Sequence, residues 1–171
     1  MIKCVIVYFS LSGNTAAVAR ALADSIKTIA QVDTIRLVPQ RKDFGFCKQA
    51  FRALIGSREK IGNVNFDLSG YNLVCLGSPV WAFGPAPSMN TYLDKCRGLK
   101  GKEAVVFTTY GSGIGNKRCL EYMKNILYKK GVKKCLSFTL QGCLAKDGCF
   151  AGSVVKHCVQ GLCADLKYPS R

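Results

Sequence analysis

An alternation of buried strands and amphipathic helices constrains this chain more than any other feature of its sequence. Residues Cys4 to Phe9 are almost all β-branched or aromatic, the pattern of a strand buried on both faces. A polar turn, Ser10 to Thr15, follows, and apolar residues then recur at helical spacing from Val18 to Ile29. Consecutive parallel strands need a crossover of this kind, so the chain opens as one strand–helix unit of an α/β fold.

The same unit repeats along the chain. Further strands are predicted at residues 34–38, 71–77, 104–109 and 135–140, and helices at residues 87–96, 117–130 and 153–166. Repeated units with right-handed crossovers predict an α/β fold with a doubly wound, five-stranded parallel sheet and helices on both faces. The longer segment between the second and third strands contains a basic amphipathic helix, residues 44–55. The chain has 171 residues and lacks a Ser- or Pro-rich linker, so residues 1–171 are expected to form a single domain.

The polar turn after the first strand is suited to an anion. It reads Ser10-Leu11-Ser12-Gly13-Asn14-Thr15 and stands directly before a helix. The first backbone N–H groups of a helix lack intrahelical acceptors and lie at the positive end of the helix dipole, so a phosphate can bind there. Ser, Asn and Thr are also ordinary N-cap residues, and this structural interpretation accounts for the composition equally well. Position favours the phosphate, because a doubly wound sheet has its ligand crevice beside the first strand.

Other phosphate-binding motifs are absent from the sequence. It contains neither G-x-G-x-x-G nor G-x-x-x-x-G-K-[ST], which argues against a Rossmann dinucleotide site and against a P-loop. The end of the second strand, Arg36 to Val38, lacks the acid with which a Rossmann fold holds a ribose. A receiver domain would need acidic residues where Ser10 and Ser78 stand.

Two aromatic segments follow the third and fourth predicted strands. Gly77 to Pro87 holds the only tryptophan, Trp81, in a rigid, proline-rich loop that can offer a flat wall to a planar ring. Thr108 to Asn116 combines Tyr110 with glycines that let a ligand approach the backbone. Taken singly, each segment is explained as a cover for the sheet end or as a flexible turn. Because all three loops leave the same edge of a parallel sheet, together they predict a site for a phosphorylated planar cofactor.

The ten cysteines indicate neither a disulfide framework nor a metal site. Strand-like residues begin at Ile2 in place of a signal peptide, so a cytoplasmic setting with reduced thiols is expected. The chain has no C-x-x-C pair and His157 is its only histidine, so we expect no metal site and interpret most thiols as small hydrophobic residues. We also expect no transmembrane segment, because the longest uncharged stretch, residues 68–93, contains three prolines.

These motifs resemble those of the flavodoxins and the wider flavodoxin-like FMN proteins. The turn Ser10–Thr15 matches the pattern [ST]-x-[ST]-G-N-T of their phosphate loop. Gly77–Pro87 is similar to the G-S-P-x-W…P-x-P loop of one subgroup, and Thr109–Gly113 is similar to the second flavin-contacting loop. The resemblance spans nearly the whole chain and implies a flavodoxin-like sheet with the strand order 2-1-3-4-5.

The resemblance also implies that FMN is the cofactor and that no catalytic acid or base is needed. The implied phosphate-binding residues are Ser10, Ser12, Gly13, Asn14 and Thr15. The implied contacts of the flavin ring are Pro79, Val80, Trp81 and Phe83 on one side, and Thr109, Tyr110, Gly111 and Gly113 on the other.

Three functions are open at this point. The first is an electron-transfer flavoprotein, in which FMN does the redox chemistry while the protein presents the ring edge to partners. The second is an FMN-dependent reductase of the same fold, linked to NAD(P)H or to a quinone. The third is a cofactor-free module whose basic helices engage nucleic acid or an anionic membrane. The stacking platform and recognition motif of a nucleic-acid binder are not evident, so no nucleic-acid partner is expected.

The charge of the chain departs from the pattern of the family. Lys and Arg number 25 against 10 Asp and Glu, a formal net charge of +15, whereas flavodoxins that act as low-potential carriers are typically acidic. Basic residues gather at residues 41–60 and 124–134. Such clusters are usually solvated faces, but they also suit the docking of an acidic redox partner, such as a ferredoxin-like protein or a reductase.

Overall fold

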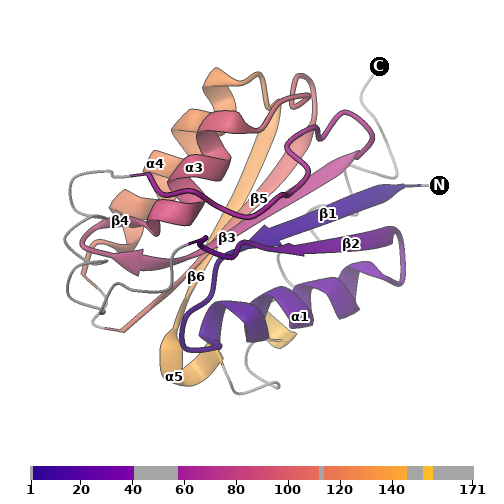
Figure 1. Ribbon diagram of the computed structural model, residues 1–171. Helices are drawn as coiled ribbons and strands as arrows, with labels where there is room; N and C mark the ends of the chain where they lie inside the picture. Colours follow the sequence, from indigo (N-terminus) through magenta and orange to yellow (C-terminus); the bar gives the residue numbers. More distant parts are fainter. Residues whose placement is uncertain (1, 41–57, 112–113, 146–151, 156–171) are drawn as a thin grey trace.

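Five parallel strands form the central sheet of the molecule (Figure 1). In spatial order they are β2 (Gln31–Arg36), β1 (Lys3–Tyr8), β3 (Leu73–Trp81), β5 (Glu103–Tyr110) and β6 (Lys134–Gln141). A two-residue strand, β4 (Gly84–Pro85), pairs antiparallel with the end of β3. The computed structural model describes residues 2–40, 58–111, 114–145 and 152–155. Numbered along the chain, the parallel strands have the order 2-1-3-4-5, which confirms the predicted doubly wound sheet.

Helices cover both faces of this sheet. They are α1 (Asn14–Ile26), α3 (Pro87–Lys95), α4 (Asn116–Lys129) and the short α5 (Gly142–Ala145). α3 and α4 pack on one face, where Met89 and Met123 are fully buried in one cluster with Val74 of β3. α1 packs on the opposite face, where Leu22 is fully buried in a second cluster with Ile6 of β1. Figure 1 shows α3 and α4 above the strands and α1 below them.

The two central strands are buried on both faces. Cys4 to Val7 in β1 and Leu73 to Ser78 in β3 are all buried. The side chains of Cys4 to Val7 and of Leu73 to Leu76 alternate between the two clusters. Full burial of each Val, Leu or Ile side chain contributes about 1.5–3 kcal/mol to folding. This burial on both sides explains why these strands form unbroken apolar runs in the sequence.

Two strands differ from the prediction at their ends. β2 was predicted at residues 34–38 but begins at Gln31, whose N–H donates to the carbonyl oxygen of Ile2 at 2.9 Å. As an edge strand with mostly exposed side chains, β2 has too little apolar pattern to mark its start. β3 was predicted to end at Gly77 but continues to Trp81, because Val80 and Trp81 pair with β4.

Some predictions lie outside the described residues. The helix predicted at residues 44–55 lies wholly outside them. Of the helix predicted at residues 153–166, the structure describes a helical segment at residues 152–155. Among the helices of the described residues, none is long and apolar enough to cross a membrane. The single domain over residues 1–171 stays a prediction.

A close contact between β3 and β5 leaves no room for a side chain at Gly77. Gly77 stands opposite Phe107 in the strand register, and a Cβ built on Gly77 would lie 2.1 Å from an atom of the Phe107 ring. Phe107 is fully buried and stacks on Phe138, with 5.7 Å between the ring centroids. The phenyl ring therefore occupies the space that any larger residue at position 77 would need.

We expect Gly77→Ala to lower the free energy of unfolding by at least about 2 kcal/mol, because the new methyl group overpacks a rigid core. Gly70→Ala is the matched control, since a Cβ at Gly70 meets nothing within 4 Å. It should change the free energy of unfolding by less than about 0.5 kcal/mol. Urea unfolding of both variants measures the difference, and equal stability would show that β3 and β5 can separate at this point without cost.

Candidate functional site

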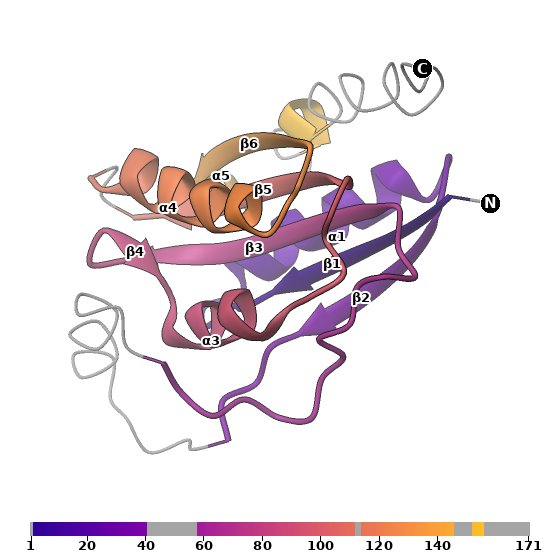
Figure 2. The ribbon, with the colours of Figure 1, turned by 90° about the horizontal axis from the view of Figure 1, so that it is seen from above.

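The loops that follow β1, β3 and β5 leave the sheet at the same edge, which we call the carboxyl edge. Parallel strands all run in one direction, and Figure 2 shows β3 running through the sheet to the β4 hairpin at this edge. The loops comprise Ser10–Gly13, the turn between β3 and β4, and the described residues Gly111, Ile114 and Gly115 after β5. The three segments singled out from the sequence therefore belong to one edge of the molecule.

The loop after β1 ends at the amino terminus of α1. Gly13 is the N-cap and has φ of 91°, a left-handed conformation that suits glycine, and nothing lies within 4 Å of the position of its missing Cβ. Ser12 is exposed, and the Oγ of the buried Ser10 accepts the Ala16 N–H at 3.2 Å. The first turn of α1 contains no acidic residue. Backbone N–H groups and hydroxyls thus surround an open turn, an arrangement that can bind an anion.

A hydrogen bond joins this loop to the end of β5. The Oγ1 of Thr15 lies 2.8 Å from the Oγ1 of Thr109, and both side chains are buried. Either hydroxyl can act as the donor. The bond links the first turn of α1 to the end of β5, so it brings the first and third predicted site segments together.

Asn14 is enclosed by the segment after β6. A Cβ at Gly142, the first residue of α5, would lie 2.5 Å from the Nδ2 of Asn14 and 3.5 Å from the carbonyl oxygen of Tyr110. The Oδ1 of Asn14 is buried and has no hydrogen-bond partner among the described residues. Leaving a buried polar atom unpaired costs free energy, so this amide oxygen, which can only accept, is suited to a hydrogen-bond donor of a bound molecule and not to an anion.

Gly142 is absent from the site residues predicted by sequence reasoning. The available signal was its position directly after the last strand, where a glycine is needed if another segment comes close. The structure adds it to the site as the residue that leaves room for the Asn14 amide.

The turn between β3 and β4 has a strained backbone. Ala82 and Phe83 have φ of 46° and 69°, a left-handed conformation that costs a non-glycine residue about 1–2 kcal/mol. Phe83 is 44% exposed and packs beside Gly115, where a Cβ would lie 2.5 Å from its ring. The second and third loops therefore touch, and strain of this kind is typical of functional loops.

Trp81 faces the core more than the edge. Only 7% of its surface is exposed, and its ring meets Phe9 edge-on, with centroids 5.4 Å apart and planes at 83°. Pro79 and Val80, the residues before it, are half-buried. The indole covers the end of the sheet, as the structural interpretation of this segment expected, and a direct part in ligand binding stays a prediction.

The third segment runs from buried to exposed positions. Thr109 is buried, Tyr110 is half-buried and Gly111 is exposed. Gly113 lies outside the described residues. The last residues of β5 thus lead from the core to an open loop at the edge.

Exposed apolar side chains form a rim around the carboxyl edge. Leu11, Phe83 and Ile114 are 54%, 44% and 68% exposed, and each belongs to a different one of the three loops. Single exposed apolar residues are ordinary in proteins. Three of them on the loops of one site favour contact with another molecule.

The charged side chains described beside the first and third loops are basic. Arg36, at the end of β2, donates an Nη2 hydrogen to the carbonyl oxygen of Ser10 at 3.3 Å. Lys117 and Arg118 are exposed in the first turn of α4. The sequence contains no Asp or Glu at residues 68–93 or 104–120, which include the second and third loops. The potential at this edge therefore attracts anions.

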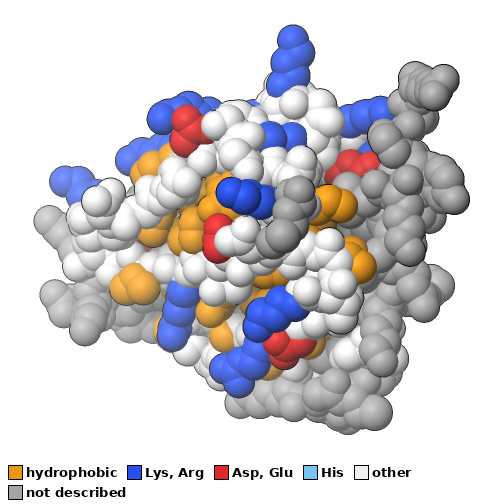
Figure 3. All heavy atoms as spheres, turned by 90° about the vertical axis from the view of Figure 1, so that its right-hand side faces the viewer, with side chains coloured by type: hydrophobic (Ala, Val, Ile, Leu, Met, Phe, Trp, Pro, Cys, Tyr) orange, Lys and Arg blue, Asp and Glu red, His pale blue; other side chains and the backbone are white. Residues whose placement is uncertain are grey.

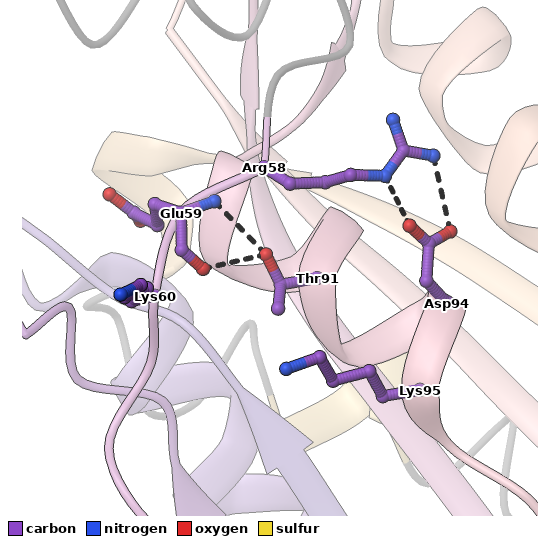
Figure 4. A pocket seen from close by; sticks show the side chains of 6 residues that line it. All are labelled: Arg58, Glu59, Lys60, Thr91, Asp94 and Lys95. Atoms are coloured by element: carbon purple, nitrogen blue, oxygen red, sulfur yellow. Dashed lines mark hydrogen bonds and ion pairs between the residues drawn. The ribbon is translucent and has the colours of Figure 1, made fainter.

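A separate hollow of about 240 Å³ lies between α3 and residues 58–60, which stand before β3 in the chain (Figure 4). It is lined by Arg58, Glu59, Lys60, Thr91, Asp94 and Lys95. The guanidinium of Arg58 binds the carboxylate of Asp94, and the Thr91 Oγ1 accepts the N–H of Glu59 at 3.0 Å. These bonds hold residues 58–60 against α3, so we interpret the hollow as a structural feature of this packing contact.

Most of the described cysteines are buried and take no part in a disulfide bond. They are Cys4, Cys75, Cys96, Cys119 and Cys135, whereas Cys143 is exposed in α5. Burial raises the pKa of the Cys96 thiol to about 11 and that of Cys119 to about 12, so both stay protonated at neutral pH. The interpretation of these five cysteines as small hydrophobic residues is confirmed. Within the described ranges, no group of three or more His, Cys, Asp or Glu residues is placed to hold a metal ion.

Comparison with known proteins identifies similar folds. A family model described as Flavodoxin matches residues 3–147. A flavoprotein from Lactobacillus acidophilus, solved in complex with FMN, is 22% identical over 80% of this chain and 93% of its own, with a TM-score of 0.62. Flavodoxin 2 from Bacillus cereus is 19% identical over 94% and 99% of the two chains, with a TM-score of 0.62. An NADH:FMN oxidoreductase in its apo form is 18% identical over 100% of this chain and 92% of its own, with a TM-score of 0.66.

The bond between Thr15 and Thr109 can be measured by a double-mutant cycle. We expect Thr15→Val and Thr109→Val each to lower the free energy of unfolding by about 1–3 kcal/mol, because each leaves one buried hydroxyl unpaired. The double variant should lose less than the sum, since it leaves neither hydroxyl behind. Urea unfolding of the four proteins gives the coupling energy, and additive losses would mean that the two hydroxyls do not interact.

Proposed function

The chain belongs to the flavodoxin family, and from this premise we propose that it binds FMN at the carboxyl edge and transfers electrons through it. FMN supplies one- and two-electron redox chemistry when bound. The observation that carries the proposal is the open turn at Gly13, at the amino terminus of α1, with the exposed hydroxyl of Ser12 beside it and no acidic residue in the first helical turn. An anion would accept hydrogen bonds from these groups. The buried Oδ1 of Asn14 is itself an acceptor, so a hydroxyl of the cofactor, and not its phosphate, would pair with it.

The residues of the first loop fit a phosphate monoester. The hydroxyl of Ser12 is exposed, and that of Ser10 retains its hydrogen when its oxygen accepts the Ala16 N–H. When Thr109 donates to Thr15, the hydrogen of the Thr15 hydroxyl is also free to donate to the phosphate. Arg36 adds a positive charge beside the loop without entering it. Hydroxyls, backbone N–H groups and the helix dipole would therefore hold the phosphate with no lysine in the loop.

The second and third loops would flank the ring of the cofactor. Pro79, Val80 and Phe83 offer half-buried and exposed apolar surface on one side, and Tyr110 and Gly111 offer ring and backbone on the other. The ring of Trp81 would support this wall from behind, because it is packed on Phe9. Gly113 belongs to the same proposed set by its place in the sequence.

Electron exchange with a partner protein is the function that the rim favours. Leu11, Phe83 and Ile114 would surround the cofactor with apolar contact surface, and Lys117 and Arg118 stand beside it. Apolar contacts ringed by charge are typical of protein interfaces, and the positive charge would select an acidic partner. We propose a ferredoxin-like protein or a reductase with an acidic surface as this partner, in the cytoplasmic setting that the sequence predicts.

A reductase is the second candidate function. The similarity to an NADH:FMN oxidoreductase, which extends over the whole of this chain, favours it. The same flavin would then accept hydride from a nicotinamide and pass electrons to a small acceptor such as a quinone.

We expect FMN to bind the apoprotein, and Ser12→Ala and Thr15→Ala each to weaken this binding roughly ten- to a hundredfold. Each variant removes a hydrogen bond to a charged acceptor, which contributes about 1.5–3 kcal/mol. Ser137→Ala makes the same change at an exposed position of β6 and should leave the affinity unaltered. Titration followed by flavin absorbance and fluorescence gives the dissociation constants. A protein that does not bind FMN would disprove the proposed function. Unaltered FMN affinity in both variants would show that the phosphate does not bind to the loop after β1.

The electron donor separates the carrier from the reductase. Under anaerobic conditions we expect NADH or NADPH alone to leave the flavin absorbance nearly unchanged, whereas a reduced acidic ferredoxin bleaches it rapidly. The rate with ferredoxin should fall steeply as salt is added, because opposite charges then attract each other less. Stopped-flow absorbance measures both reactions. Rapid bleaching by NADH alone would establish the reductase, and a rate that does not respond to salt would exclude the charged docking.

A further inference from the structure

Two loops at the opposite edge of the sheet bring six lysines together. The loop before β5 contains Lys100 and Lys102, and the connection that runs from the last residue of α4 to the first residue of β6 contains four more. We call this group the lysine patch: Lys100, Lys102, Lys129, Lys130, Lys133 and Lys134. The same two stretches, residues 100–103 and 129–134, contain one acidic residue, the half-buried Glu103. The lysine patch thus concentrates positive charge at the amino edge, where the strands begin.

Hydrogen bonds hold the two loops against each other. The N–H of Gly101 donates to the carbonyl oxygen of Gly131 at 2.7 Å, and the N–H of Lys133 donates to that of Lys102 at 2.8 Å. A Cβ at Gly131 would lie 3.2 Å from the Cα of Lys100, so the backbones are in contact. The clustering of the lysines is therefore built into the fold and does not depend on the positions of their flexible side chains.

Lys102 and Lys130 each donate to neutral carbonyl groups of the protein. The Nζ of Lys130 donates to the carbonyl oxygens of Asp94 and Cys96 at 2.9 and 2.8 Å. The Nζ of Lys102 donates to the carbonyl oxygens of Ser69 and Tyr71. Neutral carbonyls leave their charges uncompensated. Lys100, Lys129 and Lys133 are exposed to solvent beside them.

The composition of the patch indicates the kind of surface that it fits. All six cations are lysines, which act as compact hydrated point charges, whereas arginine is favoured where individual phosphates are bound in a bidentate manner. Tyr128, next to Lys129, is 44% exposed, and a phenol of this kind is suited to the boundary between lipid headgroups and water. Clusters of four to eight lysines or arginines are typical of segments that bind anionic lipids.

We propose that the lysine patch docks this protein on an anionic phospholipid surface. Figure 3 views the molecule from the side at which β1 begins, and there basic side chains are spread widely while acidic ones are few. Contact through the amino edge leaves the carboxyl edge, with its three loops, open to other molecules. The association is peripheral, electrostatic and reversible, and it does not require FMN.

The test uses the full chain and vesicles of two compositions. We expect the protein to sediment with phosphatidylcholine vesicles that contain one third phosphatidylglycerol, and not with vesicles of pure phosphatidylcholine. High salt should release the protein from the anionic vesicles. Lys100→Gln combined with Lys133→Gln should weaken binding by about 25-fold, because each lysine near an anionic membrane contributes about fivefold. Lys117→Gln combined with Arg118→Gln removes the same charge from exposed positions in the first turn of α4, at the carboxyl edge, and is the matched control. It should weaken binding by less than about threefold.

The outcomes separate this proposal from its alternatives. An equal loss of vesicle binding in the two double variants would overturn the proposal, because binding would then depend on the net charge of the protein and not on the lysine patch. An absence of binding to the anionic vesicles at low salt would overturn it as well. A short DNA duplex that binds more tightly than the vesicles at equal phosphate concentration, with the loss confined to the patch variant, would reassign the patch to nucleic acid. Urea unfolding of each variant checks that the fold is intact, and FMN titration tests the proposed function independently.

Discussion

The parallel pairing of β1, β3 and β5 is the constraint on which the rest of the structure depends. Both faces of β1 and β3 are buried, so a slip of one residue would exchange the side chains of the two clusters and is strongly disfavoured. The packing of the Phe107 ring over Gly77 fixes the register between β3 and β5. Once the register is fixed, the loops after these strands must leave at one edge. The candidate site is therefore a consequence of how the core packs.

The elements predicted correctly are those whose sequence pattern follows from burial. β1, α1, α3, α4, β5 and β6 lie within a few residues of their predicted positions, because each buries a face or a stripe that the apolar residues mark. The start of β2 was missed because an exposed edge strand has no such stripe. The β3–β4 hairpin was missed because its turn places Ala82 and Phe83 at positive φ, where glycine or asparagine is the usual signal.

The sequence predicts the residues of the candidate site, but not the contacts between them. The turn Ser10–Thr15 carries its chemistry in its composition, so its place before α1 could be inferred from local sequence alone. The bond from Thr15 to Thr109 and the approach of Gly142 to Asn14 join residues far apart in the chain, and nothing in the local pattern of either partner indicates the other. The inward position of Trp81 has the same origin, since it depends on Phe9, which directly follows β1.

Parallel strands give the molecule two chemically different edges, and this separates the two proposed contacts. The carboxyl edge collects helix amino termini, hydroxyls and an apolar rim, which suit a bound anion and a transient partner. The amino edge collects the connections that enter β5 and β6, and in this chain those connections are rich in lysine. Because the strands hold the edges apart, occupation of one leaves the other free. A positively charged protein of this fold can thus rest on an anionic surface while its candidate cofactor site stays accessible to a partner in solution.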